Sequence, residues 1–134
     1  MQVVDYIGIP WVSGGQDTDG FDCWGMVRHW NALKLDTTLP HYPASPDQVI
    51  EVARTIRGET SSERWLEIST PTKNCIVAMG KNSKVTHVGV FIGESLVLHC
   101  SREAAKCVVQ STQQIRRQWK TVKYYLPNDP SNPI

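Results

Sequence analysis

The hydrophobic periodicity of this chain changes between its two halves, and the change limits the folds that the chain can adopt. Apolar residues between positions 22 and 33 follow the spacing i, i+3, i+4, i+7, which predicts a helix with one buried face. They are Cys23, Met26, Val27, Trp30 and Leu33. Beyond position 74, short apolar runs alternate with turn residues, as in strands. Helices followed by an antiparallel sheet predict an α+β fold.

The second half of the chain predicts five strands. They cover residues 75–79, 86–92, 96–100, 107–110 and 122–126, and a short helical turn is expected at 112–119. A second helix is predicted over residues 45–56, because Ser45 can cap it and Pro46 suits its first position. Residues 59–73 are mostly polar and are expected to form a loop.

The length and composition indicate one domain. The chain has 134 residues, 40% of them hydrophobic, which suffices for one core without disulfide or metal staples. We assign residues 1–126 to this domain and expect the proline-rich residues 127–134 to form a loose tail.

The charge and hydropathy of the chain exclude several classes of partner. A net charge of +1 gives no electrostatic case for nucleic acid or an anionic membrane. No apolar stretch approaches the roughly 18 residues of a membrane span. The N-terminal residues also lack the pattern of a signal peptide. We therefore expect synthesis in a cytosol, with any export inside a larger assembly.

The four cysteines do not have the spacing of a typical zinc ribbon or redox motif. None forms a Cys-x-x-Cys pair, and Cys75, Cys100 and Cys107 are best explained as buried free thiols. Cys100 and Cys107 can face each other across a hairpin, so a disulfide between them is the alternative. A chain kept in a reducing compartment favours the free thiols.

Cys23 differs from the other cysteines because it stands where a glycine-rich loop gives way to the first predicted helix. Asp22 is a good N-cap for that helix. The first N–H groups of a helix lack internal partners, and the positive end of the helix dipole favours a thiolate. A thiolate is the reactive form of cysteine, so Cys23 is a candidate nucleophile, and its own N–H is a candidate oxyanion donor.

Two histidines can serve Cys23. His87 and His99 lie on strands joined by a tight turn, and a three-residue loop at 92–94 would pair them directly on one sheet face. One imidazole could then take the proton of Cys23 while the other orients the first. A catalytic zinc held by Cys23, His87 and His99 is the competing use of the same atoms, although it lacks an evident fourth ligand.

Several sequence blocks, taken in order, resemble the NlpC family of papain-like cysteine peptidases. The first are Gly8-Ile9-Pro10-Trp11-Val12 and Gly20-Phe21-Asp22-Cys23-Trp24-Gly25, followed by Thr86-His87-Val88-Gly89-Val90 and Leu98-His99. The resemblance extends over roughly residues 6–110. It implies a small papain-like core in which the cysteine helix packs on a five- to six-stranded antiparallel sheet.

The resemblance also implies an activity. Members of this family cut stem peptides of bacterial peptidoglycan, often between D-glutamate and diaminopimelate or lysine. By position, Cys23 would be the nucleophile, His87 the base and His99 the orienting residue. Trp11, Asp22 and Trp24 would contact the substrate, and no cofactor or metal is implied. The alternatives are an amidase or acyltransferase on the same fold, and a non-catalytic tail-assembly protein.

Three departures from the common family pattern stand out, of which Lys73-Asn74, in place of the usual Gly-Asp before the first strand, is neutral. Trp24 stands where many members have serine, a form that resembles members associated with bacteriophage tails. Trp11 stands where many have a tyrosine whose hydroxyl helps the oxyanion site, and its indole offers only an N–H donor. From Trp24 we expect a virion tail setting at a host cell wall, with other tail proteins as partners.

Overall fold

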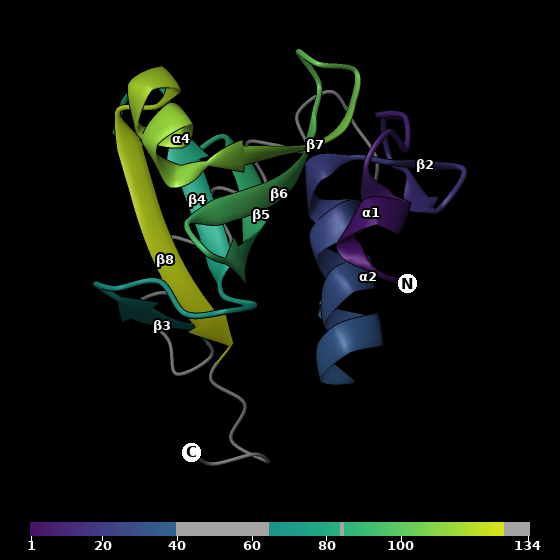
Figure 1. The fold of residues 1–134 in the computed structure, drawn as a ribbon, viewed down its shortest axis with the longest axis horizontal. Helices are drawn as coiled ribbons and strands as arrows, with labels where there is room; N and C mark the ends of the chain where they lie inside the picture. The colour runs from purple at the N-terminus through teal and green to yellow at the C-terminus, as the bar shows by residue number, and fades with distance from the viewer. Residues whose placement is uncertain (40–64, 84, 128–134) are drawn as a thin grey trace.

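A computed structural model of the chain describes residues 1–39, 65–83 and 85–127 (Figure 1). The predicted helix at 45–56 and the last seven residues of the predicted tail lie outside the described residues. The described helices are α1 (Val3–Tyr6), α2 (Cys23–Leu35) and α4 (Thr112–Gln118). The strands are β1 (Gln16–Asp17), β2 (Gly20–Phe21), β3 (Trp65–Ile68), β4 (Ile76–Gly80), β5 (His87–Gly93), β6 (Leu96–Ser101), β7 (Lys106–Ser111) and β8 (Thr121–Pro127).

Helix α2 confirms the helix predicted from the sequence, but Leu33, predicted to lie on its buried face, is exposed. The Asp22 side chain caps it by accepting a hydrogen bond from the Gly25 N–H at 2.6 Å. The helix ends at Asp36, whose backbone is left-handed (φ 50°). It packs chiefly on β5, beside the sheet in Figure 1.

The main sheet confirms the α+β fold and is antiparallel throughout its six strands. Their order is β3-β8-β4-β5-β6-β7. The five strands predicted from the sequence correspond to β4 to β8. The loop predicted at 59–73 is wrong for residues 65–68, which form β3. That strand is held at the sheet edge by pairing with β8, a partner about 60 residues away in sequence that local patterning does not reveal.

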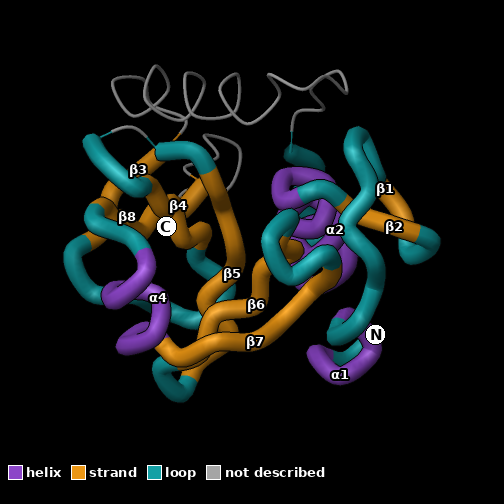
Figure 2. The backbone as a smooth tube through the Cα atoms, turned by 90° about the horizontal axis from the view of Figure 1, so that it is seen from above, coloured by secondary structure: helices purple, strands orange, loops and turns teal. Residues whose placement is uncertain are grey.

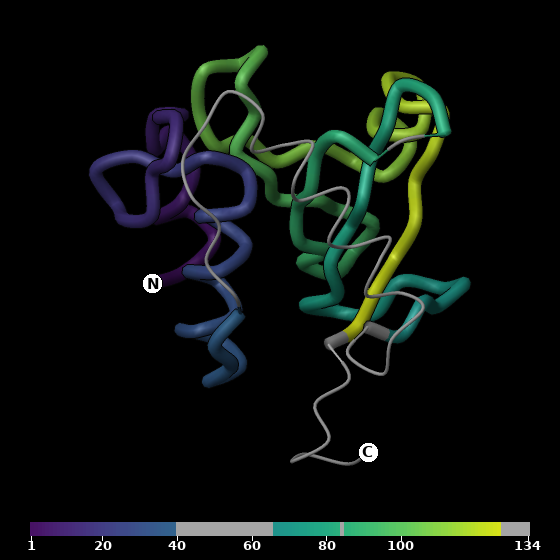
Figure 3. The backbone as a smooth tube through the Cα atoms, turned by 180° about the vertical axis from the view of Figure 1, so that it is seen from behind, coloured from purple at the N-terminus to yellow at the C-terminus, as the bar shows by residue number. Residues whose placement is uncertain are grey.

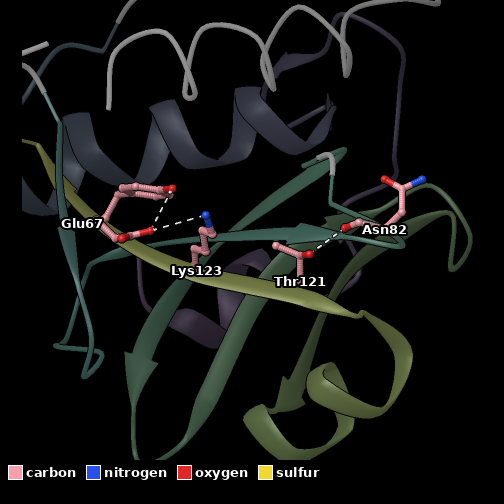
Figure 4. A network of polar contacts seen from close by, with 5 residues as sticks. Glu67, Asn82, Thr121 and Lys123 are labelled. Carbon is pink, nitrogen blue, oxygen red and sulfur yellow. Dashed lines mark hydrogen bonds and ion pairs between the residues drawn. The ribbon is translucent and has the colours of Figure 1, made fainter. Parts of the chain in front are cut away.

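Polar contacts fasten β8 to its neighbours (Figure 4). On β3, Glu67 receives a hydrogen bond from the Tyr125 hydroxyl at 3.4 Å and an ion pair from Lys123 at 3.8 Å. At the other end of β8, the Thr121 hydroxyl donates to the Asn82 carbonyl at 2.6 Å. Because the Lys123 and Glu67 side chains are exposed, their ion pair orders the edge more than it stabilises the fold.

The sheet buries apolar side chains on both faces. One cluster lies between the sheet and α2 and includes Met26, Trp30, Val88 and Val90. The second cluster lies on the face covered by Ile115 of α4. Figures 2 and 3 show α2 and α4 at opposite sides of the molecule. All five residues of β4 are buried, which explains why its sequence is a continuous apolar run.

No helix within the described parts of the chain is long and apolar enough to cross a membrane.

Candidate active site

The hairpin that joins β5 and β6 decides how the two histidines meet. Its turn residues Glu94 and Ser95 both have positive φ (53° and 61°), as in a two-residue turn. Such a turn alone would put His87 and His99 on opposite faces. A bulge between Phe91 and Gly93 shifts the register by one residue and returns them to the same face.

Direct pairing of the histidines, as predicted from the sequence, is therefore wrong. The register Val90↔Leu98, continued by one residue, places Gly89 opposite His99, so His87 is a diagonal neighbour of His99. The absent side chain of Gly89 makes room: a Cβ there would lie 2.8 Å from the His99 Cβ. The imidazoles still meet, with His87 Nε2 and His99 Nδ1 2.8 Å apart.

The pair of histidines extends to a residue that the sequence analysis did not identify. His99 Nε2 lies 2.8 Å from the side-chain oxygen of Gln110 on β7. His99 pairs with Val108, so Gln110 is again a diagonal neighbour on the same face. The available signal in the sequence was a polar residue on the strand that pairs with the strand of His99. Only the correct strand register shows that Gln110 lies beside His99.

His87 is also held by an aromatic stack. Its ring lies 5.4 Å from the Trp119 ring, with the planes 11° apart. The Lys81 ammonium lies 4.3 Å from the centroid of the same Trp119 ring. Burial, the neighbouring His99 and the Lys81 charge lower the pKa of His87 to about 3. Burial likewise lowers the pKa of His99, which is 2% exposed. Both imidazoles are therefore neutral at neutral pH.

Cys23 is the first residue of α2, and its side chain reaches the start of β5. The backbone N–H of Val88, next to His87 in sequence, favours a charged Cys23 sulfur and so lowers the pKa of the thiol. The N–H groups of Cys23 and Trp24 also favour a charged sulfur. Burial, with the Asp22 carboxylate as the second cause, nevertheless raises the pKa of Cys23 to about 12. The expectation of a resting thiolate is therefore wrong, because desolvation of a side chain 3% exposed outweighs the helix terminus.

Gly25 lets the loop before α2 pack against its first turn. A Cβ on Gly25 would lie 2.0 Å from the Gly15 carbonyl oxygen, which accepts a hydrogen bond from the Asp22 N–H at 3.1 Å. The glycine two residues after Cys23 therefore fixes the loop on which the cysteine begins its helix.

The three residues predicted to contact substrate lie in different surroundings. Trp11 is half-buried, with the Arg102 guanidinium 5.5 Å from its ring, and its backbone N–H donates to the Ala105 carbonyl. Asp22 is buried and acts as the helix cap. Trp24 is 1% exposed within the core, so its observed role is packing, and it has almost no surface for substrate contact. Its burial corrects the prediction for this residue.

Comparison with known proteins now identifies the chain. The model of the NlpC/P60 family matches residues 8–124. The chain belongs to this family. Comparison with curated proteins gives no match.

Solved structures with this NlpC/P60 fold share little sequence with the chain. The NlpC/p60 domain of the peptidoglycan hydrolase SagA aligns with a TM-score of 0.63 at 19% identity, covering 92% of each chain. NlpC2 from Trichomonas vaginalis gives 0.68 at 19% identity, over 94% of this chain and 44% of that one. The peptidoglycan hydrolase RipB from Mycobacterium tuberculosis gives 0.56 at 20% identity, over 91% and 59%. These likenesses establish the fold.

The other cysteines of this NlpC/P60 domain take no part in the contacts that join His87, His99 and Gln110. Cys75, Cys100 and Cys107 are buried free thiols, as is Cys23. Cys100 pairs directly with Cys107 across β6 and β7, and its thiol donates to the Phe21 carbonyl at 3.2 Å. Within residues 1–39, 65–83 and 85–127, no group of three His, Cys, Asp or Glu side chains could hold a metal ion.

Proposed function

We propose that this NlpC/P60 domain is a cysteine endopeptidase that hydrolyses stem-peptide bonds of bacterial peptidoglycan. The chain belongs to the NlpC/P60 family, and one observation carries the proposal. The Cys23 thiol at the start of α2 is influenced by the backbone N–H of Val88 on β5, and the residue before Val88, His87, contacts His99. The peptidoglycan hydrolases SagA and RipB, named among the similar structures, support this substrate class.

In the proposed mechanism Cys23 is the nucleophile, His87 is the base and His99 orients His87. Because Cys23 and His87 are both neutral at rest, His87 takes the thiol proton as sulfur attacks the peptide carbonyl. A carbon–sulfur bond forms, and the carbonyl electrons move onto oxygen. The N–H groups at the start of α2 stabilise this oxyanion. The contact with His99 keeps the His87 ring in place.

The remaining steps return the enzyme to its starting state. The tetrahedral intermediate collapses, the carbon–nitrogen bond breaks, and imidazolium His87 gives its proton to the departing amine. Water, deprotonated by His87, then attacks the thioester and releases the acid and the Cys23 thiol. We propose the bond between D-glutamate and diaminopimelate as the site of cleavage, with Trp11 contributing exposed surface to the substrate.

Digestion of purified sacculi by the parent chain and by Cys23→Ala tests the proposal. The parent is expected to release muropeptides with one new amine and one new acid, identified by mass spectrometry, whereas Cys23→Ala releases none. Cys75→Ala is the matched control, since it removes a buried thiol away from the histidines and should remain active. Equal digestion by parent and Cys23→Ala would refute the role of Cys23.

The same digestion in ¹⁸O-labelled water separates hydrolysis from acyl transfer. A hydrolase incorporates one labelled oxygen into the new acid, whereas an acyltransferase passes the acyl group to another amine.

We further propose a bacteriophage tail as the setting of this chain, on the basis of Trp24 after the cysteine alone. Detection of the chain by mass spectrometry in purified virions from its host would support this setting, and its absence from them would refute it.

A further inference from the structure

We infer that Gln110 is a positioning residue that fixes the tautomers of both histidines and thereby presents His87 Nδ1 as the base. The inference rests on the proposed function for its catalytic consequence. Its structural part concerns only where the ring protons lie.

The positions of the ring hydrogens on His87 and His99 follow from the acceptor that His99 faces, the side-chain oxygen of Gln110. The Gln110 side-chain oxygen, 2.8 Å from His99 Nε2, can only accept, so His99 Nε2 must carry a hydrogen. A neutral imidazole has one N–H, which leaves His99 Nδ1 as an acceptor. His87 Nε2, 2.8 Å away, must then be the donor. His87 Nδ1 is left with a free electron pair.

This assignment of ring hydrogens matters because His87 can act as a base only if its free electron pair is on the nitrogen that accepts the proton. If His99 carried its hydrogen on Nδ1, it would donate to His87 Nε2, and the His87 proton would sit on Nδ1. His87 could not then accept a proton there. Gln110 therefore acts through His99, two strands away from His87, without touching the reacting atoms.

Burial makes this control by hydrogen bonding effective. His99 is 2% exposed, so water competes poorly for its ring nitrogens. Both histidines are neutral, so each ring carries one hydrogen, which can be on either nitrogen. The Gln110 hydrogen bond acts against burial on the His99 pKa, as expected for an acceptor facing an N–H.

Nitrogen NMR of the histidine rings tests the inference without any turnover. In Cys23→Ala, which is not expected to act on substrate, His87 and His99 should both show the Nε2–H pattern. Gln110→Met removes the acceptor at similar length, and His99 should then gain the Nδ1–H form. Gln113→Met is the matched control on exposed surface of α4 and should leave both patterns unchanged. A His99 that is Nδ1–H in the Gln110-containing chain overturns the inference.

Kinetics provide the second readout. Gln110→Met should lower kcat about 5- to 20-fold with little change in KM, since one orienting hydrogen bond is lost and substrate contacts are kept. Gln110→Glu retains an acceptor and adds a negative charge, so it should recover most of kcat while moving the acid limb of the pH profile to higher pH. A fully active Gln110→Met would overturn the positioning role.

The two experiments separate this inference from the proposed function. If the parent fails to cleave sacculi but shows both Nε2–H tautomers, the proposed function fails and the structural part of the inference stands. If the parent cleaves sacculi but its tautomers do not depend on Gln110, only the inference fails.

Discussion

The imidazole of His87 stacks on the indole of Trp119, with ring centroids 5.4 Å apart and planes 11° apart. The two residues are 32 positions apart in sequence, and α4 brings Trp119 to the histidine because Trp119 follows its last turn. The stack limits the rotation of the His87 ring, which in the proposed mechanism keeps one nitrogen toward His99 and the other available to accept a proton.

Replacement of Trp119 tests this stack. Trp119→Leu should lower kcat/KM about 3- to 10-fold, because an aromatic pair contributes roughly 0.5–1.5 kcal/mol beyond its buried area. Trp119→Phe retains a stacking ring and should stay within about threefold of the parent. Rates of stem-peptide cleavage measure both. A Leu variant as active as the Phe variant would mean that the stack does not orient His87.

The lowered pKa of His87 predicts a loss of stability in acid. Between its folded pKa of about 3 and the ordinary value of 6.5, the unfolded chain binds more protons than the folded chain. Stability should therefore fall as the pH drops below about 6.5, by roughly 1–2 kcal/mol at pH 5 for this partly exposed group. Urea unfolding at pH 7.5 and pH 5 measures this change. His87→Asn should show a smaller change, and an equal change would exclude His87 as a source.

Gly89 is predicted to be irreplaceable by a larger residue. In Gly89→Ala, the new Cβ would lie 2.8 Å from both the His99 Cβ and the Leu98 carbonyl oxygen. We expect a loss of about 1–3 kcal/mol in the free energy of unfolding and a lower kcat, since His99 must move. Gln113→Ala, on exposed surface, should change stability by less than about 0.5 kcal/mol. A Gly89→Ala variant with parental stability and rate would contradict the close packing.

Asp22 has two effects that different substitutions separate. Asp22→Asn keeps an oxygen for the Gly25 N–H but removes the negative charge, so the pKa of Cys23 should fall while stability changes little. Asp22→Ala removes the cap as well and should cost about 1 kcal/mol.

The pH dependence of iodoacetamide labelling at Cys23, followed by peptide mass spectrometry, measures the first effect. The labelling curve of Asp22→Asn should lie at lower pH than that of the parent. Asp19→Asn, an exposed aspartate in the same loop, is the control and should leave the curve in place. Superimposable curves for Asp22→Asn and the parent would show that the carboxylate does not influence the thiol.

The sequence by itself determined the elements whose cause is local. The apolar spacing after Asp22 and the capping side chain produced α2 with Cys23 at its start, and the alternating runs after residue 74 produced β4 to β8. These features depend on side chains within a turn or a strand, so periodicity and capping chemistry suffice to predict them. The α+β class and the order of the site residues follow from the same local evidence.

Only the tertiary structure decided the contacts that depend on register and burial. One extra residue in the bulge after Phe91 put His87 and His99 on one face, and the β6–β7 register brought Gln110 to His99. Pairing with β8 turned residues 65–68 into a strand. Burial, which no local pattern measures, made the thiol of Cys23 neutral at rest where its position at a helix start predicted a thiolate.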